Sequence, residues 1–152
     1  MADYPTHVKI VEVGARDGLQ NESAVSTADK ITLLNALADA GLKHIEAGAF
    51  VSPKWVPQMA DSADVIQGIT RHPGIEISAL TPNLKGAELA LENQVDEFAI
   101  FTAASEAFTQ KNINCSIEQS IERFRPVVEL AQKRDHRRSP HCTPCQTVAV
   151  RT

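Results

Sequence analysis

The stretch Val11–Glu22, VEVGARDGLQNE, decides the fold class because it joins an apolar run to two adjacent charged residues. The β-branched, alternating pattern of Val8–Val13 predicts a strand, and residues 26–40 carry apolar side chains at helical spacing. Ser26 or Thr27 is expected to cap this helix at its start, and Gly41 is expected to end it. Strand, loop and helix therefore follow one another in the order of a βα unit. The loop of this unit carries Arg16 and Asp17, so its charged pair is expected at the end of a strand.

The same order of strand, loop and helix repeats three more times along the chain. We expect further strands at 44–47, 75–80 and 95–101, and further helices at 62–70, at 85–92 and from Glu106 with a restart at Ser116. Pro126 falls inside the last helical pattern and is predicted to kink or end it. Four βα units in series predict a parallel sheet covered by helices.

Two architectures fit this order of elements. One is an open doubly wound sheet, and the other is half of a (β/α)8 barrel, which needs about 250 residues when complete. The chain has 152 residues, and this length alone favours the open sheet. Residues 135–152 lose the helical periodicity and gather prolines and two cysteines, Cys142 and Cys145. We therefore expect one domain over residues 1–134 and an irregular tail over 135–152.

Composition and charge exclude several classes of protein. The net charge is −4 and no basic stripe with interleaved aromatic residues is present, which argues against nucleic-acid binding. No apolar run approaches the roughly 20 residues that span a bilayer, and Met1–His7 lacks the pattern of a secretory signal. Three cysteines are too few for a disulfide framework. A cytoplasmic protein without membrane or nucleic-acid partners is predicted.

The residues able to carry chemistry are expected on one rim of the sheet, because loops after parallel strands gather there. Arg16 and Asp17 follow the first strand, Glu46 is expected at the end of the second, and Ser105 follows the fourth. A carboxylate can bind a divalent cation while a neighbouring guanidinium meets an anionic oxygen. Two alternatives remain open here: the Arg-Asp pair is a solvated surface pair, and Glu46 is an ion-paired structural residue.

Three motifs carry a family resemblance: GARDGLQNE at 14–22, IEAGAFVSPKWVPQMADS at 45–62 and AASEAFTQKNINCSIEQS at 103–120. They resemble the 3-hydroxy-3-methylglutaryl-CoA lyases, which belong to a metal-dependent superfamily of (β/α)8 lyases and Claisen-condensing enzymes. The resemblance runs from about residue 7 to residue 134. It implies an α/β chain of the TIM-barrel family with only the first four βα units, which is half a barrel.

The resemblance also implies an activity and a role for each candidate residue. The reaction is cleavage of an acyl-CoA substrate, hydroxymethylglutaryl-CoA, to acetyl-CoA and acetoacetate with Mg²⁺ or Mn²⁺, a step of leucine breakdown and ketone-body formation. By similarity Asp17 is a metal ligand, Arg16 steadies the enolate oxygen and Glu46 orders polar groups of the site. Gln20 and Ser105 are implied to contact substrate.

Departures from the family pattern qualify these expectations. The chain has Ala15 and Ala49 where the family often has proline and a hydroxyl residue, and the family's remaining metal ligands and reactive cysteine have no counterpart in this sequence. A shifted reading frame would produce a tail such as 135–152. Half a barrel exposes a strand edge and apolar strand faces, so the chain is expected to be unstable, to aggregate or to pair with a second copy as a homo-oligomer. The isolated chain is expected to be inactive. A related condensing enzyme, of the isopropylmalate or homocitrate synthase type, and a non-catalytic fragment are the alternatives.

Overall fold

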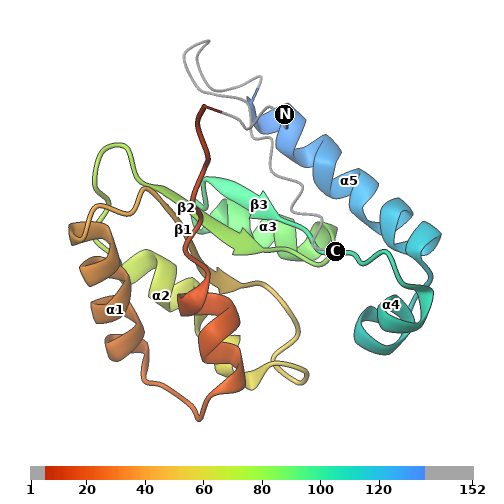
Figure 1. Cartoon of the computed structure of the whole chain (residues 1–152), viewed down its shortest axis with the longest axis horizontal. Coiled ribbons are helices and arrows are strands. Elements are labelled where there is room, and N and C mark those ends of the chain that lie inside the picture. Colours follow the sequence, from red (N-terminus) through yellow and green to blue (C-terminus); the bar gives the residue numbers. More distant parts are fainter. Residues whose placement is uncertain (1–5, 136–152) are drawn as a thin grey trace.

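A computed structural model of the chain describes residues 6–135, and the predicted tail beyond Asp135 lies outside the described residues. Its centre is a parallel sheet of β1 (His44–Ala49), β2 (Glu76–Leu80) and β3 (Glu97–Ala99), in the order β1-β2-β3. Figure 1 shows the sheet in the middle of the molecule, with α3 behind it. A parallel sheet was predicted, and it is confirmed.

The helices follow the strands in the predicted alternation. Their bounds are α1 (Thr27–Asp39), α2 (Ser62–Gly68), α3 (Leu84–Glu92), α4 (Glu106–Ile113) and α5 (Ile117–Asp135). Three single turns add to these: η1 (Gly14–Gly18), η2 (Leu19–Asn21) and η3 (Pro57–Met59). Within residues 6–135, no helix is long and apolar enough to cross a membrane.

Local capping explains where α1 begins and ends. Ser26 precedes the helix, and its hydroxyl oxygen accepts a hydrogen bond of 3.2 Å from the Asp29 N–H. Gly41 follows the helix with φ of +93°, a conformation that glycine adopts without the steric penalty of a side chain. Both boundaries were predicted from the sequence, and both are confirmed.

The first predicted strand is wrong. Val8–Val13 forms only one bridge to the sheet, in which the Glu12 N–H donates to the His44 carbonyl at 2.9 Å and the Glu46 N–H donates to the Glu12 carbonyl at 2.8 Å. Val8 is 75% exposed. A strand needs a neighbour along its length, and in the described part of the chain only Glu12 has one.

The break between the last two helices is confirmed. Of the two outcomes predicted for Pro126, a helix end is wrong, and a kink stays a prediction. Asn114 ends α4 in the left-handed conformation with φ of +51°. Pro126 lies inside α5, and the helix continues through it to Asp135. Phe124 and Val127 on either side of the proline are buried in the core, and this packing holds the helix together across the missing N–H donor.

The sheet has two faces of opposite chemistry. The face toward the helices is apolar and buried, with Ile45, Ala47, Ile77, Ala79 and Phe98 in the core. The strand register places His44, Glu46, Glu76, Ser78 and Glu97 on the other face. We call these five residues the polar face. The expectation that half a barrel would expose apolar strand faces does not hold for β1–β3, whose face without a helical cover is polar, but Val8 and Ile10 of the predicted first strand are exposed.

Candidate active site at the Arg16 turn

A single turn of π-helix, η1, presents the adjacent charged residues Arg16 and Asp17. The Asp17 N–H donates to the Val13 carbonyl at 2.7 Å, and the Glu12 carboxylate accepts a hydrogen bond of 2.6 Å from the first N–H of the turn. Glu12 also makes the single backbone bridge to β1. The turn is therefore fixed to the sheet immediately before the charged pair.

Arg16 lies between two carboxylates. Its Nε donates to Glu46 Oε1 at 2.6 Å, and its Nη1 donates to Asp17 Oδ1 at 2.8 Å. Arg16 is 8% exposed and Glu46 is 5% exposed, so water screens this pair little. A solvated surface pair is excluded for Arg16. The prediction of an ion-paired Glu46 is confirmed, and the two contacts hold the guanidinium in one orientation.

Asp17 accepts a second hydrogen bond from the next turn. Gln20 Nε2 donates to the same oxygen, Asp17 Oδ1, at 3.1 Å, and Asn21 Nδ2 donates to the Asp17 carbonyl at 2.9 Å. The Asp17 side chain is 41% exposed, unlike its neighbour Arg16. Gln20, predicted to contact substrate, therefore orients Asp17 in this structure. Four predicted residues are joined by these hydrogen bonds.

Glu46 lies inside β1, so its predicted place at the end of a strand is wrong. The strand continues to Ala49 after a register shift between Glu46 and Gly48. Small residues allow this continuation: a Cβ at Gly48 would come within 2.7 Å of Ser62 Oγ. The Ala49 N–H donates to the same hydroxyl at 3.0 Å. The start of α2 is thereby fastened to β1 beyond the candidate site.

The other rim residues have structural partners. Ser105 is exposed and caps α4, accepting a hydrogen bond of 3.3 Å from the Phe108 N–H. Asn83 caps α3 in the same way through the Gly86 N–H at 3.0 Å. The fully buried Thr81 donates its N–H to β3. The Arg16 turn and β1 thus supply the joined cluster, whereas Ser105 starts a helix.

A second charged cluster lies on the polar face and was not predicted. Lys9 Nζ is 3.1 Å from Glu97 Oε2 and 3.4 Å from Glu76 Oε2, and His44 Nδ1 is 2.8 Å from Glu76 Oε2. Burial lowers the pKa of Lys9, but the two carboxylates together raise it above its usual 10.5. The signal that singled out Glu46, an acid inside an apolar strand, applies equally to these two glutamates.

The described residues do not complete a metal site. Among residues 6–135 no group of three or more histidine, cysteine, aspartate or glutamate residues could hold a metal ion. Magnesium wants near-octahedral oxygen coordination, and Asp17 supplies one carboxylate. Cys142 and Cys145 lie outside the described residues.

Comparison with known proteins points to one family. The family model described as HMGL-like matches residues 7–150. The chain is 60% identical over 132 residues to a 3-hydroxy-3-isohexenylglutaryl-CoA/hydroxymethylglutaryl-CoA lyase of Pseudomonas aeruginosa, and the match covers 86% of this chain and 44% of that protein. It is 58% identical over 130 residues to the mitochondrial hydroxymethylglutaryl-CoA lyase of Gallus gallus, covering 85% and 44% of the two chains.

Solved structures agree with the sequence matches. The crystal structure of the hydroxymethylglutaryl-CoA lyase from Pseudomonas aeruginosa superposes with a TM-score of 0.81 at 60% identity, over 86% of this chain and 44% of that chain. A lyase from Acinetobacter baumannii, solved with coenzyme A and 3-methylmalate, gives a TM-score of 0.78 at 43% identity, over 81% and 41%. The chain therefore spans less than half the length of the relatives it matches.

Proposed function

Because the chain belongs to the HMGL-like family, we propose that it carries the Arg16 part of a hydroxymethylglutaryl-CoA lyase site. The reaction of the complete site would cleave hydroxymethylglutaryl-CoA to acetyl-CoA and acetoacetate. The observation that carries the proposal is the buried Arg16, held by Glu46 and Asp17, in a chain 60% identical to a lyase over 132 residues.

The proposed role of Arg16 follows from the charge that this cleavage develops. When the carbon–carbon bond breaks, negative charge builds on the thioester oxygen of the enolate product. A fixed positive group beside that oxygen stabilises the transition state, and it needs no reorganisation if it is already oriented. Nε and Nη1 of Arg16 are used by the two carboxylates, while the guanidinium carries five N–H donors in all. Glu46 would act through Arg16, as a positioning residue.

Asp17 is proposed as one ligand of a divalent cation, Mg²⁺ or Mn²⁺, with the other ligands supplied from outside residues 6–135. Carboxylate oxygen suits both ions. Gln20, through its hydrogen bond to Asp17, would hold that carboxylate in place. Ser105 is proposed to contact the acyl-CoA substrate, because a hydroxyl that accepts one hydrogen bond can still donate its own proton.

The proposal includes a role in leucine breakdown and a cytoplasmic location. One matched lyase is named as mitochondrial, so members of the family differ in compartment. The proposal also includes the predicted division of the chain into a domain over residues 1–134 and a tail over residues 135–152. The 152-residue chain alone is expected to show no turnover, since the described residues form no metal site. Acetoacetate release at an ordinary enzymatic rate by this chain with added Mn²⁺ would contradict that expectation.

A chimeric enzyme tests the proposed function. Residues 7–134 of this chain would replace the matched segment of the Pseudomonas aeruginosa lyase, and acetoacetate release from hydroxymethylglutaryl-CoA would be measured with Mn²⁺. We expect cleavage within about tenfold of the parent lyase, and a loss of at least about 100-fold in Arg16→Met. A folded chimera that cleaves nothing, or that condenses acyl-CoA with a keto acid instead, would overturn the proposal.

A further inference from the structure

The loop after β1 carries the most exposed large apolar side chain among residues 6–135. This residue is Trp55, which is 86% exposed and is the single tryptophan of the chain. Lys54, next to it, is also exposed. An indole ring is mostly apolar, so the fold gains nothing from leaving its faces in water. Both faces of the ring are available to a ligand that reaches this loop.

The backbone around Trp55 forms a hydrogen-bonded turn. The N–H groups of Trp55 and Val56 both donate to the Ser52 carbonyl, at 2.9 and 3.2 Å. Pro53 and Pro57 restrict the backbone on either side of the turn, because the proline ring fixes φ. The ring is therefore presented on a preformed turn, and a ligand that binds it loses little affinity to ordering of the loop.

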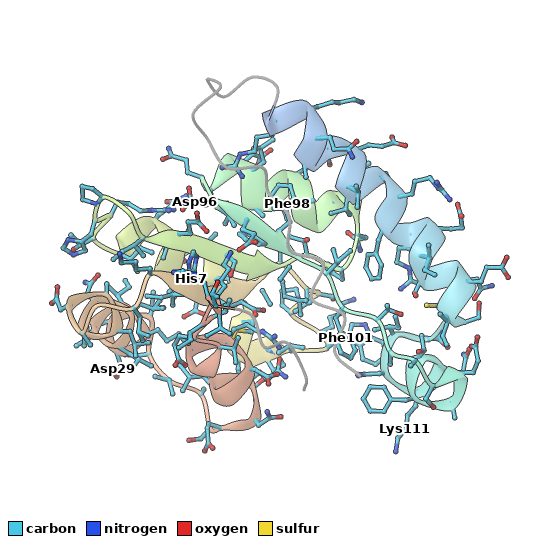
Figure 2. All side chains as sticks on the ribbon, turned by 45° about the horizontal axis from the view of Figure 1, so that its top comes forward. His7, Asp29, Asp96, Phe98, Phe101 and Lys111 are labelled. Carbon is cyan, nitrogen blue, oxygen red and sulfur yellow. The ribbon has the colours of Figure 1, made fainter. Side chains whose placement is uncertain are left out.

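Hydrogen bonds fasten this loop beside the Arg16 turn. Lys30 is 6% exposed, and its Nζ donates to the Gln58 carbonyl at 2.6 Å, which holds the end of the loop against α1. Gln58 Nε2 donates to the carbonyl of Glu22, directly after η2, at 3.3 Å. Figure 2 labels Phe101 just after β3, and the loop and the Arg16 turn both lie toward that end of the strands. Trp55 and the candidate active site therefore share one rim.

We propose that Trp55 and Lys54 bind the nucleotide end of the acyl-CoA substrate, an inference that rests on the proposed lyase function. Coenzyme A ends in an adenine ring with phosphate groups, and a pantetheine arm joins this nucleotide to the thioester. An indole face stacks on adenine, and a lysine ammonium attracts phosphate. The arm separates the nucleotide from the reacting carbon, so the nucleotide lies on the rim outside the Arg16 turn, where this loop is.

Fluorescence tests the proposal directly, because Trp55 is the only tryptophan of the 152-residue chain. Adenosine 3′,5′-bisphosphate and pantetheine would be titrated separately, with N-acetyltryptophanamide as the correction for light absorbed by adenine. We expect saturable quenching by the nucleotide and none by pantetheine. Lys54→Gln should weaken nucleotide binding about threefold, whereas the matched control Lys43→Gln, an exposed lysine at the other end of β1, should not weaken it. Quenching that does not saturate would overturn the inference.

The chimeric lyase gives a second measurement, which does not require the isolated chain to fold. Trp55→Leu should raise KM for hydroxymethylglutaryl-CoA at least about fivefold, and Trp55→Phe should raise it less, because a ring that can stack remains. With hydroxymethylglutaryl-pantetheine, which lacks the nucleotide, Trp55→Leu and the parent chimera should have equal kcat/KM.

Equal losses on the two substrates, or an unchanged KM for hydroxymethylglutaryl-CoA in Trp55→Leu, would overturn the inference. A chimera that cleaves neither substrate would instead contradict the proposed function, and the fluorescence titration would then decide whether the loop binds the nucleotide.

Discussion

The same three strands build both faces of the sheet, but one face packs into the apolar core and the other carries ion-paired acidic residues. Toward the helices, alternate residues such as Ile45 and Ile77 are apolar and buried in the core. Toward the other side, Glu46 and Glu97 are also buried, at 5% and 7% exposure, but are paired with cations. Burial alone therefore does not distinguish the core residues of this chain from the charged residues of the polar face. The distinction lies in what each buried side chain contacts, apolar neighbours or a cation.

The largest change should come from the apolar face. Ile45→Ala removes a side chain that is 1% exposed, and we expect a loss of about 2–5 kcal/mol in the free energy of unfolding. Urea unfolding followed by circular dichroism measures it. Val8→Ala is the control on an exposed apolar side chain, with an expected change within about 0.5 kcal/mol. Equal losses in the two variants would contradict the distinction between buried and exposed apolar side chains.

A smaller loss is expected on the polar face. Glu46→Gln keeps the shape of the side chain but leaves buried Arg16 without the charge that its Nε contacts. The expected cost is about 1–3 kcal/mol in the free energy of unfolding. Glu76→Gln is its control, because the Glu76 side chain is 43% exposed and its pairs are screened, so about 1 kcal/mol at most is expected. A larger loss in the control would contradict the ranking.

The ion pair between Lys30 of α1 and Asp61, just before α2, lies on the helical side of the sheet and extends the comparison of the two faces. Burial raises the pKa of Asp61, but hydrogen bonds from Lys30 Nζ at 2.6 Å and Thr27 Oγ1 at 2.7 Å lower it below its usual 3.8. The stabilisation is therefore complete above pH 3.8 and is lost as the pH falls through the lower folded-state pKa. Asp61→Asn should cost about 1–2 kcal/mol at pH 6 and flatten the acid limb of the stability curve.

Urea unfolding between pH 6 and pH 3 measures this dependence. Asp39→Asn serves as the control, because the Asp39 side chain is 73% exposed and lies 3.7 Å from His72. An Asp61→Asn curve that keeps the parent's acid limb would remove the Lys30–Asp61 contact from the account.

The smallest effect is expected at the start of α4. Ser105→Ala removes the cap on the Phe108 N–H and should cost about 1 kcal/mol, and Ser105→Asn should restore it because asparagine caps as well as serine does. Thermal unfolding measures both variants. In the chimeric lyase the same pair separates the two roles of Ser105: if the cap alone matters, Ser105→Asn keeps the parent KM, whereas a raised KM supports a substrate contact.

The features of the fold that depend on hydrophobic periodicity and helix capping were predicted from the sequence. The alternation of strands and helices, the ends of α1 at Ser26 and Gly41, and the gap between α4 and α5 all follow from local side-chain chemistry. The motif resemblance predicted the family, which the comparisons show. Arg16 and Glu46, 30 positions apart in sequence, were placed on the same rim by the βα order, and the structure joins them at 2.6 Å.

The errors share one physical cause: the sequence pattern of a segment does not show which other segments pack against it in the folded protein. Val8–Val13 alternates like a strand, yet a strand forms only where another strand pairs with it. Pro126 lacks a donor, yet buried residues on both sides hold α5 intact. The charged cluster on the polar face was not predicted, because the ion pair of Glu97 with Lys9 joins residues that are far apart in the sequence.

The most direct test of the account is the NMR spectrum of the Arg16 Nε–H in the 152-residue chain. A buried ion pair with Glu46 predicts a resolved resonance protected from exchange with water, which shifts or disappears in Glu46→Gln and is unchanged in Glu76→Gln. An Arg16 signal that exchanges like an exposed arginine, or that responds equally to both variants, would contradict the claim that β1 holds this guanidinium in place.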